Sequence, residues 1–139
     1  MKNAMTCAHI ETAAQAAALI RAELPKNQDE ERVFVLPLDG NGKVLAKPIL
    51  VSVGHEDGTA AIDAGAIFRE ALKAGAEEII VAHNHPSGNP TPSKADIKAT
   101  AELKDLAARL GVRFLDHIIL GAPDAAQGLG FFSLTETLS

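Results

Sequence analysis

Residues 78–96 read EIIVAHNHPSGNPTPSKAD, and this stretch passes from a predicted strand through a loop into a predicted helix. Residues 78–82 form a short apolar run, which is typical of a buried strand. Residues 83–92 are dense in proline, glycine, asparagine and serine, which are turn-forming residues. A helix is expected over residues 93–110, because Ser93 is a favourable N-cap and Gly111 a favourable stop.

Strands and helices alternate on both sides of this stretch. Downstream, residues 112–120 predict a strand, residues 121–130 a loop and residues 131–134 a short last strand. Upstream, residues 62–74 carry apolar side chains at helical spacing, and the predicted helix ends at Gly75. The elements therefore indicate strands paired in one sheet, with helices packed on it.

The N-terminal part predicts a helix followed by a hairpin. Alanine-rich residues 10–24 have helical spacing and stop at Pro25, and residues 26–31 read as a loop. Residues 33–38 predict a strand, and Asp39-Gly40-Asn41-Gly42 is typical of a hairpin turn. Residues 43–53 would return as a strand, in which Pro48 indicates an edge or a bulge, before a loop over residues 54–59. The expected class is α/β, or mixed α+β, with a single sheet and flanking helices.

Composition narrows the class of protein. At 139 residues, with 47% hydrophobic and 22% charged residues, the chain is about one soluble domain long. Its formal net charge is -5, its lysines and arginines form no run, and it has no tryptophan or tyrosine. These features weigh against nucleic acid as a partner, although they leave a local basic groove open.

Cysteine content and hydropathy indicate the compartment. Cys7 is the single cysteine of the chain, so an intrachain disulfide framework and a cysteine-rich zinc site are excluded. Residues 1–10 show no long apolar signal region, and no apolar run approaches the ~20 residues of a membrane span. We therefore expect a cytoplasmic protein without a membrane partner, and the sequence leaves its oligomeric state open.

Three side chains in residues 78–96 are suited to bind a metal. His83 and His85 stand two residues apart, so in an extended backbone they point to the same side. Asp96 falls in the first turn of the following helix, where it can complete a three-ligand site. Two imidazoles and one carboxylate, with a fourth position left to water, are typical of catalytic zinc, which activates its bound water.

A structural interpretation of the same residues stays open. Ser93-x-x-Asp96 is also a relative of the capping box, which needs no metal to explain it. His-x-His alone is a weak motif that often occurs without a metal. Both interpretations can hold together, because Ser93 can cap the helix and still face the site.

The longer pattern resembles a known family. His83-x-His85-Pro86 followed by Ser93-x-x-Asp96 is similar to the signature of JAB/MPN (JAMM) metalloproteases. The string HNHPSG, with PTPSKAD after it, resembles the RadC-like branch, as do the LDHIILG run of residues 115–121 and the Phe132-Ser133 pair. The resemblance covers about residues 31–134. It implies a JAB/MPN-like fold, with a catalytic domain over residues 31–139 and an N-terminal helix and loop, residues 1–30, packed on it.

The resemblance also implies roles for individual residues. His83, His85 and Asp96 would bind Zn²⁺, and Ser93 would hydrogen-bond the water or stabilise the oxyanion. The family's general base would be Glu31, which precedes the strand at the matching distance, with Glu30 as the alternative. The implied activity is zinc-dependent hydrolysis of peptide or isopeptide amide bonds, with a protein or peptide as substrate.

Other functions compete with this one. RadC-like proteins usually carry an N-terminal helix-hairpin-helix region linked to DNA repair, for which the residues before Glu31 are too few. A repair-associated role and a non-catalytic partner-binding MPN module are the alternatives. The intact set of three ligands favours an enzyme over such a module. A zinc deaminase would need a Pro-Cys-x-x-Cys motif, which a chain with one cysteine lacks.

Four further residues have simpler interpretations. Asp116 and His117 are expected to form a structural hydrogen-bonded pair, or His117 orients a ligand histidine. Thr100, one helical turn after Asp96, is expected to contribute packing. Cys7 is expected to be a free thiol.

Overall fold

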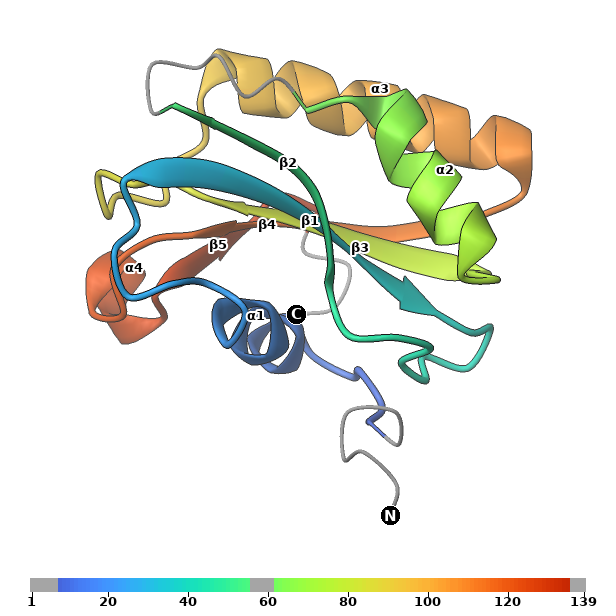
Figure 1. The fold of residues 1–139 in the computed structure, drawn as a ribbon, viewed down its shortest axis with the longest axis horizontal. Helices are drawn as coiled ribbons and strands as arrows, with labels where there is room; N and C mark the ends of the chain where they lie inside the picture. Colours follow the sequence, from blue (N-terminus) through green and yellow to red (C-terminus); the bar gives the residue numbers. More distant parts are fainter. Residues whose placement is uncertain (1–7, 56–61, 136–139) are drawn as a thin grey trace.

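Five strands form one sheet in the order β2-β1-β3-β4-β5 (Figure 1). The computed structural model describes residues 8–55 and 62–135, so Cys7 lies outside the described part. The β3–β4 pair is parallel and the other pairs are antiparallel. This sheet confirms the predicted mixed α+β class. The strands are β1 Glu30–Leu38, β2 Ile49–His55, β3 Glu78–Asn84, β4 Arg113–Leu120 and β5 Phe131–Ser133.

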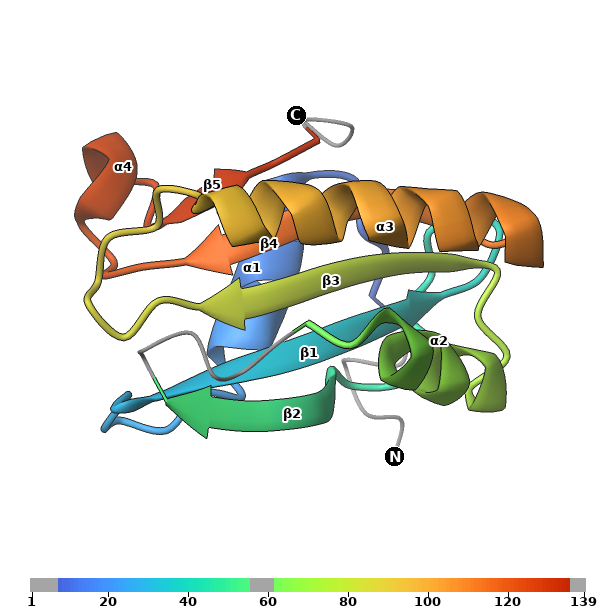
Figure 2. The same ribbon diagram turned by 90° about the horizontal axis from the view of Figure 1, so that it is seen from above.

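Helices cover both faces of the sheet. Helix α1 (Ala13–Arg21) lies on one face, and α2 (Ala64–Lys73) and α3 (Lys94–Leu110) lie on the other (Figures 1 and 2). Even-numbered residues of β1 point toward α1 and odd-numbered ones toward α2 and α3, as strand alternation requires. Each face therefore has its own apolar core.

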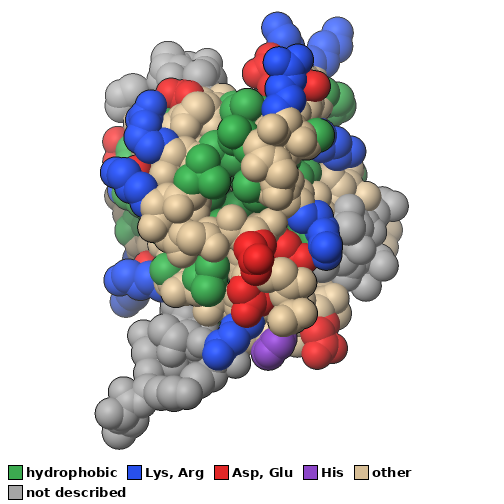
Figure 3. Space-filling model, turned by 90° about the vertical axis from the view of Figure 1, so that its right-hand side faces the viewer, with side chains coloured by type: hydrophobic (Ala, Val, Ile, Leu, Met, Phe, Trp, Pro, Cys, Tyr) green, Lys and Arg blue, Asp and Glu red, His purple; other side chains and the backbone are tan. Residues whose placement is uncertain are grey.

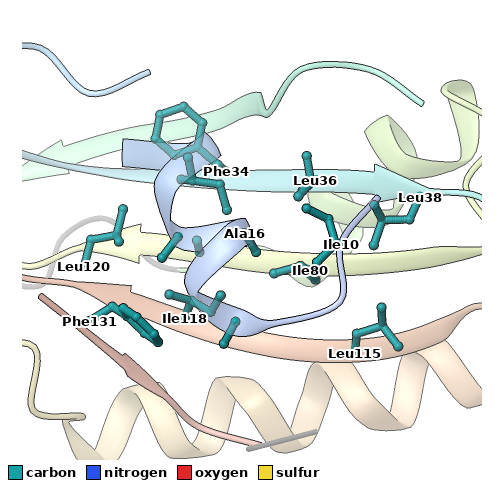
Figure 4. Packing of buried hydrophobic residues seen from close by; sticks show 14 of the residues in the cluster. Ile10, Ala16, Phe34, Leu36, Leu38, Ile80, Leu115, Ile118, Leu120 and Phe131 are labelled. Atoms are coloured by element: carbon teal, nitrogen blue, oxygen red, sulfur yellow. The ribbon is translucent and has the colours of Figure 1, made fainter. Parts of the chain in front are cut away.

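The core beneath α1 joins the N-terminal helix to the strands. Ala16 and Ile20 of α1 are fully buried and belong to the same cluster as Phe34, Leu36 and Ile118 (Figure 4). The predicted division into residues 1–30 and 31–139 stays a prediction, but α1 packs directly on the sheet.

Helix ends follow the local signals in the sequence. Thr12 accepts a hydrogen bond from the backbone N–H of Gln15 in a capping box, so α1 is shorter than the predicted residues 10–24. Asp63 caps α2 and Ser93 caps α3. Gly111, at φ 72°, ends α3 in the left-handed conformation that favours glycine.

Several predicted boundaries were wrong. β3 continues through His83 and Asn84, which had been predicted as loop, and β1 already begins at Glu30. The returning strand begins only at Ile49, after Pro48, which has no N–H to donate to a ladder. β2 is an edge strand, as Pro48 indicated. The predicted loop 121–130 contains the short helix α4 (Ala125–Gly128).

The end of the molecule at which α2 and α3 finish lies away from His83. Apolar side chains gather there, with acidic and basic side chains interspersed around them (Figure 3).

Among the helices of the described ranges, none has the length and apolar character that a membrane crossing requires.

Candidate metal centre

His83 and His85 converge at the end of β3 nearest the start of α3. His83 pairs with Val33 of β1 and is fully buried, while His85 follows the last strand residue. Their Nε2 atoms lie 3.2 Å apart. The predicted same-side arrangement of the two rings is confirmed, because the backbone stays extended through His83 and Asn84.

Asp96 meets both imidazoles from the first turn of α3. Its Oδ1 lies 3.2 Å from His83 Nε2, and its Oδ2 lies 3.2 Å from His85 Nε2. The Ser93 N–H donates to Asp96 Oδ2, and Ser93 Oγ accepts from the Asp96 N–H. The capping box and the site therefore use the same carboxylate at once.

The neighbours of Asp96 keep it ionised. Burial by itself would raise the pKa of this carboxyl, but His83, His85 and the Ser93 N–H outweigh burial and hold the pKa well below its usual range. Asp96 thus presents a full negative charge to both imidazoles.

Glu31 brings a second carboxylate to the same place. It lies two residues before Val33 on β1, so its side chain points to the face that carries His83. Its Oε1 is 3.4 Å from His83 Nε2. Burial, only partly offset by His83 and His85, raises the pKa of Glu31.

Glu30 points elsewhere. Its carboxylate lies 3.5 Å from the guanidinium of Arg32, two residues along the strand. Neighbouring residues of a strand face opposite sides of the sheet, so Glu30 and Glu31 cannot share one site. The structure thus brings Glu31, and not the alternative Glu30, to the two histidines.

The donor set has the dimensions of a zinc site. Within the described ranges, Glu31, His83 and His85 form one group that could hold a metal ion, with ligand atoms within 4.8 Å of one another. Tetrahedral zinc with bonds of about 2.0 Å has ligand atoms about 3.3 Å apart, close to the 3.2 Å between the two Nε2 atoms and the 3.4 Å between His83 Nε2 and Glu31 Oε1. Asp96, which is not a member of that group, lies 3.2 Å from each imidazole through a different oxygen. Nitrogen and carboxylate donors therefore fit Zn²⁺ in chemistry and in spacing.

His85 turns its lone pair toward this group. Its Nδ1 lies 2.9 Å from the carbonyl oxygen of Asn89, which can only accept, so Nδ1 carries a hydrogen. Nε2 is then free to bind a cation. Without a metal, the hydrogen bond to Asp96 outweighs burial and raises the pKa of His85, so a proton competes for the same nitrogen.

Ser93 lies at the rim of the group. It is the N-cap of α3 and is exposed to solvent. Its Oγ accepts the Asp96 N–H, and a hydroxyl that accepts one hydrogen bond can still donate its own hydrogen.

Sequence analysis missed the role of Asn84. Its buried side chain accepts the backbone N–H of Arg32 at 2.7 Å and donates to the backbone carbonyl of Glu30 at 3.1 Å. Asn84 therefore fixes the backbone on both sides of Glu31. No spacing pattern identifies Asn84, because its partners lie more than fifty residues earlier in the chain.

Thr100 also contacts the residues of the site. The prediction of simple packing is wrong, because Thr100 Oγ1 lies 2.7 Å from His117 Nδ1 and donates to the Asp96 carbonyl at 2.9 Å. His117 Nε2 in turn lies 2.9 Å from His83 Nδ1. Burial, followed by the neighbouring His83, lowers the pKa of His117 to about 3, so this ring is neutral at pH 7.

The predicted Asp116–His117 pair is present as well. Asp116 Oδ1 accepts the backbone N–H of His117 at 2.8 Å, and the same carboxylate accepts from Ser133 and Thr135. The two interpretations of this pair are thus compatible, because Asp116 acts on the backbone while the His117 ring contacts His83.

The raised pKa of His85 predicts how zinc affinity depends on pH. A proton and zinc compete for Nε2. As the pH is lowered, the apparent zinc affinity should therefore begin to fall while the pH is still above the ordinary imidazole pKa of 6.5. One displaced proton gives a decrease of about tenfold per pH unit below that point. Competition with a chelator at pH 5.5 to 8.5 measures the slope, and a flat profile would contradict the prediction.

Gly121 is expected to tolerate no side chain. A Cβ at this position would meet the Gly88 carbonyl oxygen and lie 2.6 Å from Cδ of Pro90. The loop that must move carries Asn89, the partner of His85. We expect Gly121→Ala to cost about 1–3 kcal/mol of folding free energy and to weaken zinc binding. Thermal unfolding and chelator competition measure both effects.

Gly65→Ala is the matched control for this substitution. Its Cβ would lie 3.4 Å from Asp63 Oδ1, an ordinary contact, inside helix α2. Alanine is favoured over glycine within a helix, so this variant should be at least as stable as the parent. A Gly121→Ala variant as stable as Gly65→Ala would mean that the loop has room for a side chain at Gly121.

Comparison with known proteins places the chain among similar sequences. It matches the family described as RadC-like JAB domain over residues 10–137. A UPF0758 protein of Carboxydothermus hydrogenoformans is 46% identical over 95 residues, which are 68% of this chain and 41% of that protein. A UPF0758 protein of Acaryochloris marina is 42% identical over 130 residues, which are 94% of this chain and 50% of that protein. The chain therefore spans only about two fifths to one half of the length of these relatives.

Proposed function

This chain belongs to the family of RadC-like JAB domains, and we propose that it is a zinc-dependent hydrolase that cleaves peptide or isopeptide amide bonds. The observation that carries the proposal is the convergence of two imidazole nitrogens and two carboxylates at one end of the sheet. One carboxylate is needed as a ligand and the other as a base. The substrate would be a protein or peptide.

We assign Asp96 as the ligand and Glu31 as the base. Asp96 contacts both imidazoles and is held ionised, which suits a permanent ligand. Glu31 contacts one imidazole and has a raised pKa, which suits a group that must take up and release a proton. His83 and His85 would supply the two nitrogen ligands.

Each residue then has its own role in amide hydrolysis. Bound zinc would supply Lewis acidity, which lowers the pKa of a water molecule and polarises a carbonyl group. Glu31 takes the proton of the attacking water as the new C–O bond forms. It delivers that proton to the leaving amine as the C–N bond breaks. Ser93, with its hydroxyl hydrogen available, donates to the carbonyl oxygen as negative charge develops there.

Metal analysis and a cleavage assay test this proposal together. The purified protein should contain about one zinc per chain, and His83→Ala should contain little. Zinc-loaded protein should cleave a mixed set of quenched peptide and isopeptide substrates, and a chelator should abolish cleavage until zinc is restored. A protein that binds zinc at this site and cleaves nothing would favour the non-catalytic module instead.

A further inference from the structure

We propose that Thr100 and His117 are positioning residues, and that the Thr100 hydroxyl decides which nitrogen of His83 faces the metal. The inference rests on the metal site of the proposed function, and it is independent of which bond is cleaved. It concerns a chain of contacts that runs from α3 through β4 to β3.

The contacts form an unbroken line inside the protein. Thr100 Oγ1 donates to the Asp96 carbonyl at 2.9 Å and lies 2.7 Å from His117 Nδ1. His117 Nε2 lies 2.9 Å from His83 Nδ1. Both rings are fully buried and Thr100 is 6% exposed, so water does not replace these partners. The line begins at one proposed ligand, Asp96, and ends at another, His83.

The Thr100 hydroxyl determines which ring nitrogens of His117 and His83 carry hydrogens. A backbone carbonyl only accepts, so the single hydrogen of the Thr100 hydroxyl is committed to the Asp96 carbonyl. Thr100 Oγ1 must then accept from His117, which places the His117 hydrogen on Nδ1. His117 Nε2 is left with a lone pair, so it accepts from His83 Nδ1–H. His83 Nε2 consequently presents its lone pair to the metal site.

The competing arrangements are costly. If the threonine hydroxyl donated to His117 instead, two oxygen atoms 2.9 Å apart would face each other without a hydrogen between them. If both nitrogens of His117 carried hydrogens, a positive charge would be buried where no solvent reaches it. The order given above satisfies every donor and acceptor of the line.

The same order has a consequence for the site. His85 Nδ1–H is committed to the Asn89 carbonyl, so His85 Nε2 also carries a lone pair. Two lone pairs then face each other across 3.2 Å, with two carboxylates beside them. A metal ion between them would offset this repulsion, and Thr100 and His117 hold one of these donors ready for it.

A β-bulge places His117 in this line. The register of β3 with β4 shifts by one residue, so that Ile79 pairs with Phe114 but Ile80 pairs with Asp116. His117 therefore pairs with Val81 and shares the face of His83. Without the extra residue in β4, His117 would lie opposite Ala82 and point toward α1.

Thr100→Val and Thr100→Ser form the matched pair that tests the inference. Valine has nearly the shape of threonine but no hydroxyl, whereas serine keeps the hydroxyl. Loss of a partner that orients a ligand typically weakens metal binding by about 10- to 100-fold. We expect this loss in zinc affinity for Thr100→Val, by chelator competition, and at least partial rescue in Thr100→Ser. Equal affinities in these two variants would overturn the inference.

The nitrogen-15 spectrum of the histidine rings provides a second readout that needs neither activity nor zinc. Metal-free wild-type protein and Thr100→Ser should show His117 as the Nδ1–H form. Thr100→Val should shift His117 toward the Nε2–H form, because valine cannot accept the Nδ1 hydrogen. A wild-type His117 with its hydrogen on Nε2 would overturn the inference even if no variant folds.

These readouts separate the two proposals. If the protein cleaves no amide bond but the Thr100 pair differs in zinc affinity, the proposed activity fails and the positioning role stands. If cleavage occurs but the Thr100 pair is identical in affinity and in ring spectra, the activity stands and the positioning role fails.

Discussion

Replacing Glu31 by glutamine is expected to lower kcat by about 10²- to 10⁴-fold while zinc remains bound, because a general base contributes about that factor. Glutamine has the shape of glutamate but cannot take up the proton. Glu31 contacts His83 at 3.4 Å from a different strand, so its amide would leave the contacts of Asp96 with the imidazoles intact. Steady-state kinetics on a substrate found by the cleavage assay, together with zinc content, measure both expectations.

Glu30→Gln is the control for this experiment. Glu30 stands next to Glu31 on β1 but pairs with Arg32, and its side chain lies on the other face. Its substitution removes the same charge from the chain, so it should leave kcat and zinc content near those of the parent. Loss of zinc in Glu31→Gln would show that Glu31 is a ligand and would exchange the roles assigned to the two carboxylates.

Replacing Asp96 by asparagine is expected to lower zinc affinity by about 100-fold or more. Zinc sites in small domains are worth about 10–16 kcal/mol over four ligands, so one ligand accounts for about 3 kcal/mol. Asparagine keeps an oxygen that can accept the Ser93 N–H, so helix α3 should retain its cap. Chelator competition measures the affinity, and circular dichroism confirms that the helix persists.

Asp105→Asn supplies the matched comparison. Asp105 lies in the same helix, where it forms an exposed i,i+4 pair with Arg109, far along α3 from the site. Exposed pairs of this kind contribute little to stability, so the substitution should change neither folding nor zinc binding measurably. An Asp96→Asn variant that bound zinc as tightly as Asp105→Asn would remove Asp96 from the ligand set.

The location and the partners of this protein stay predictions. None of the helices in residues 8–55 and 62–135 could cross a membrane, and the cytoplasmic location stays a prediction. The matched residues make up 41% and 50% of the length of two relatives, so the substrates and partners of a whole protein of this family stay proposals.

Residues close together in sequence were the easiest to interpret. Ser93 and Asp96 are three residues apart, and a helix N-terminus places them in contact whatever surrounds it. His83 and His85 point the same way because extended backbone alternates with a period of two. Short-range geometry of this kind follows from the backbone alone, so the sequence by itself determined the helix caps, the order of strands and helices and the paired histidines.

Long-range placement was decided only by the tertiary structure. Glu31 reaches His83 because β1 pairs antiparallel with β3 in one register, and a shift by one residue would turn Glu30 inward instead. His117 reaches His83 because of the single bulge in β4, and Thr100 joins it because α3 packs on that face. Register and bulges depend on the packing of the whole sheet, since local residues favour several registers almost equally and only the buried core distinguishes them.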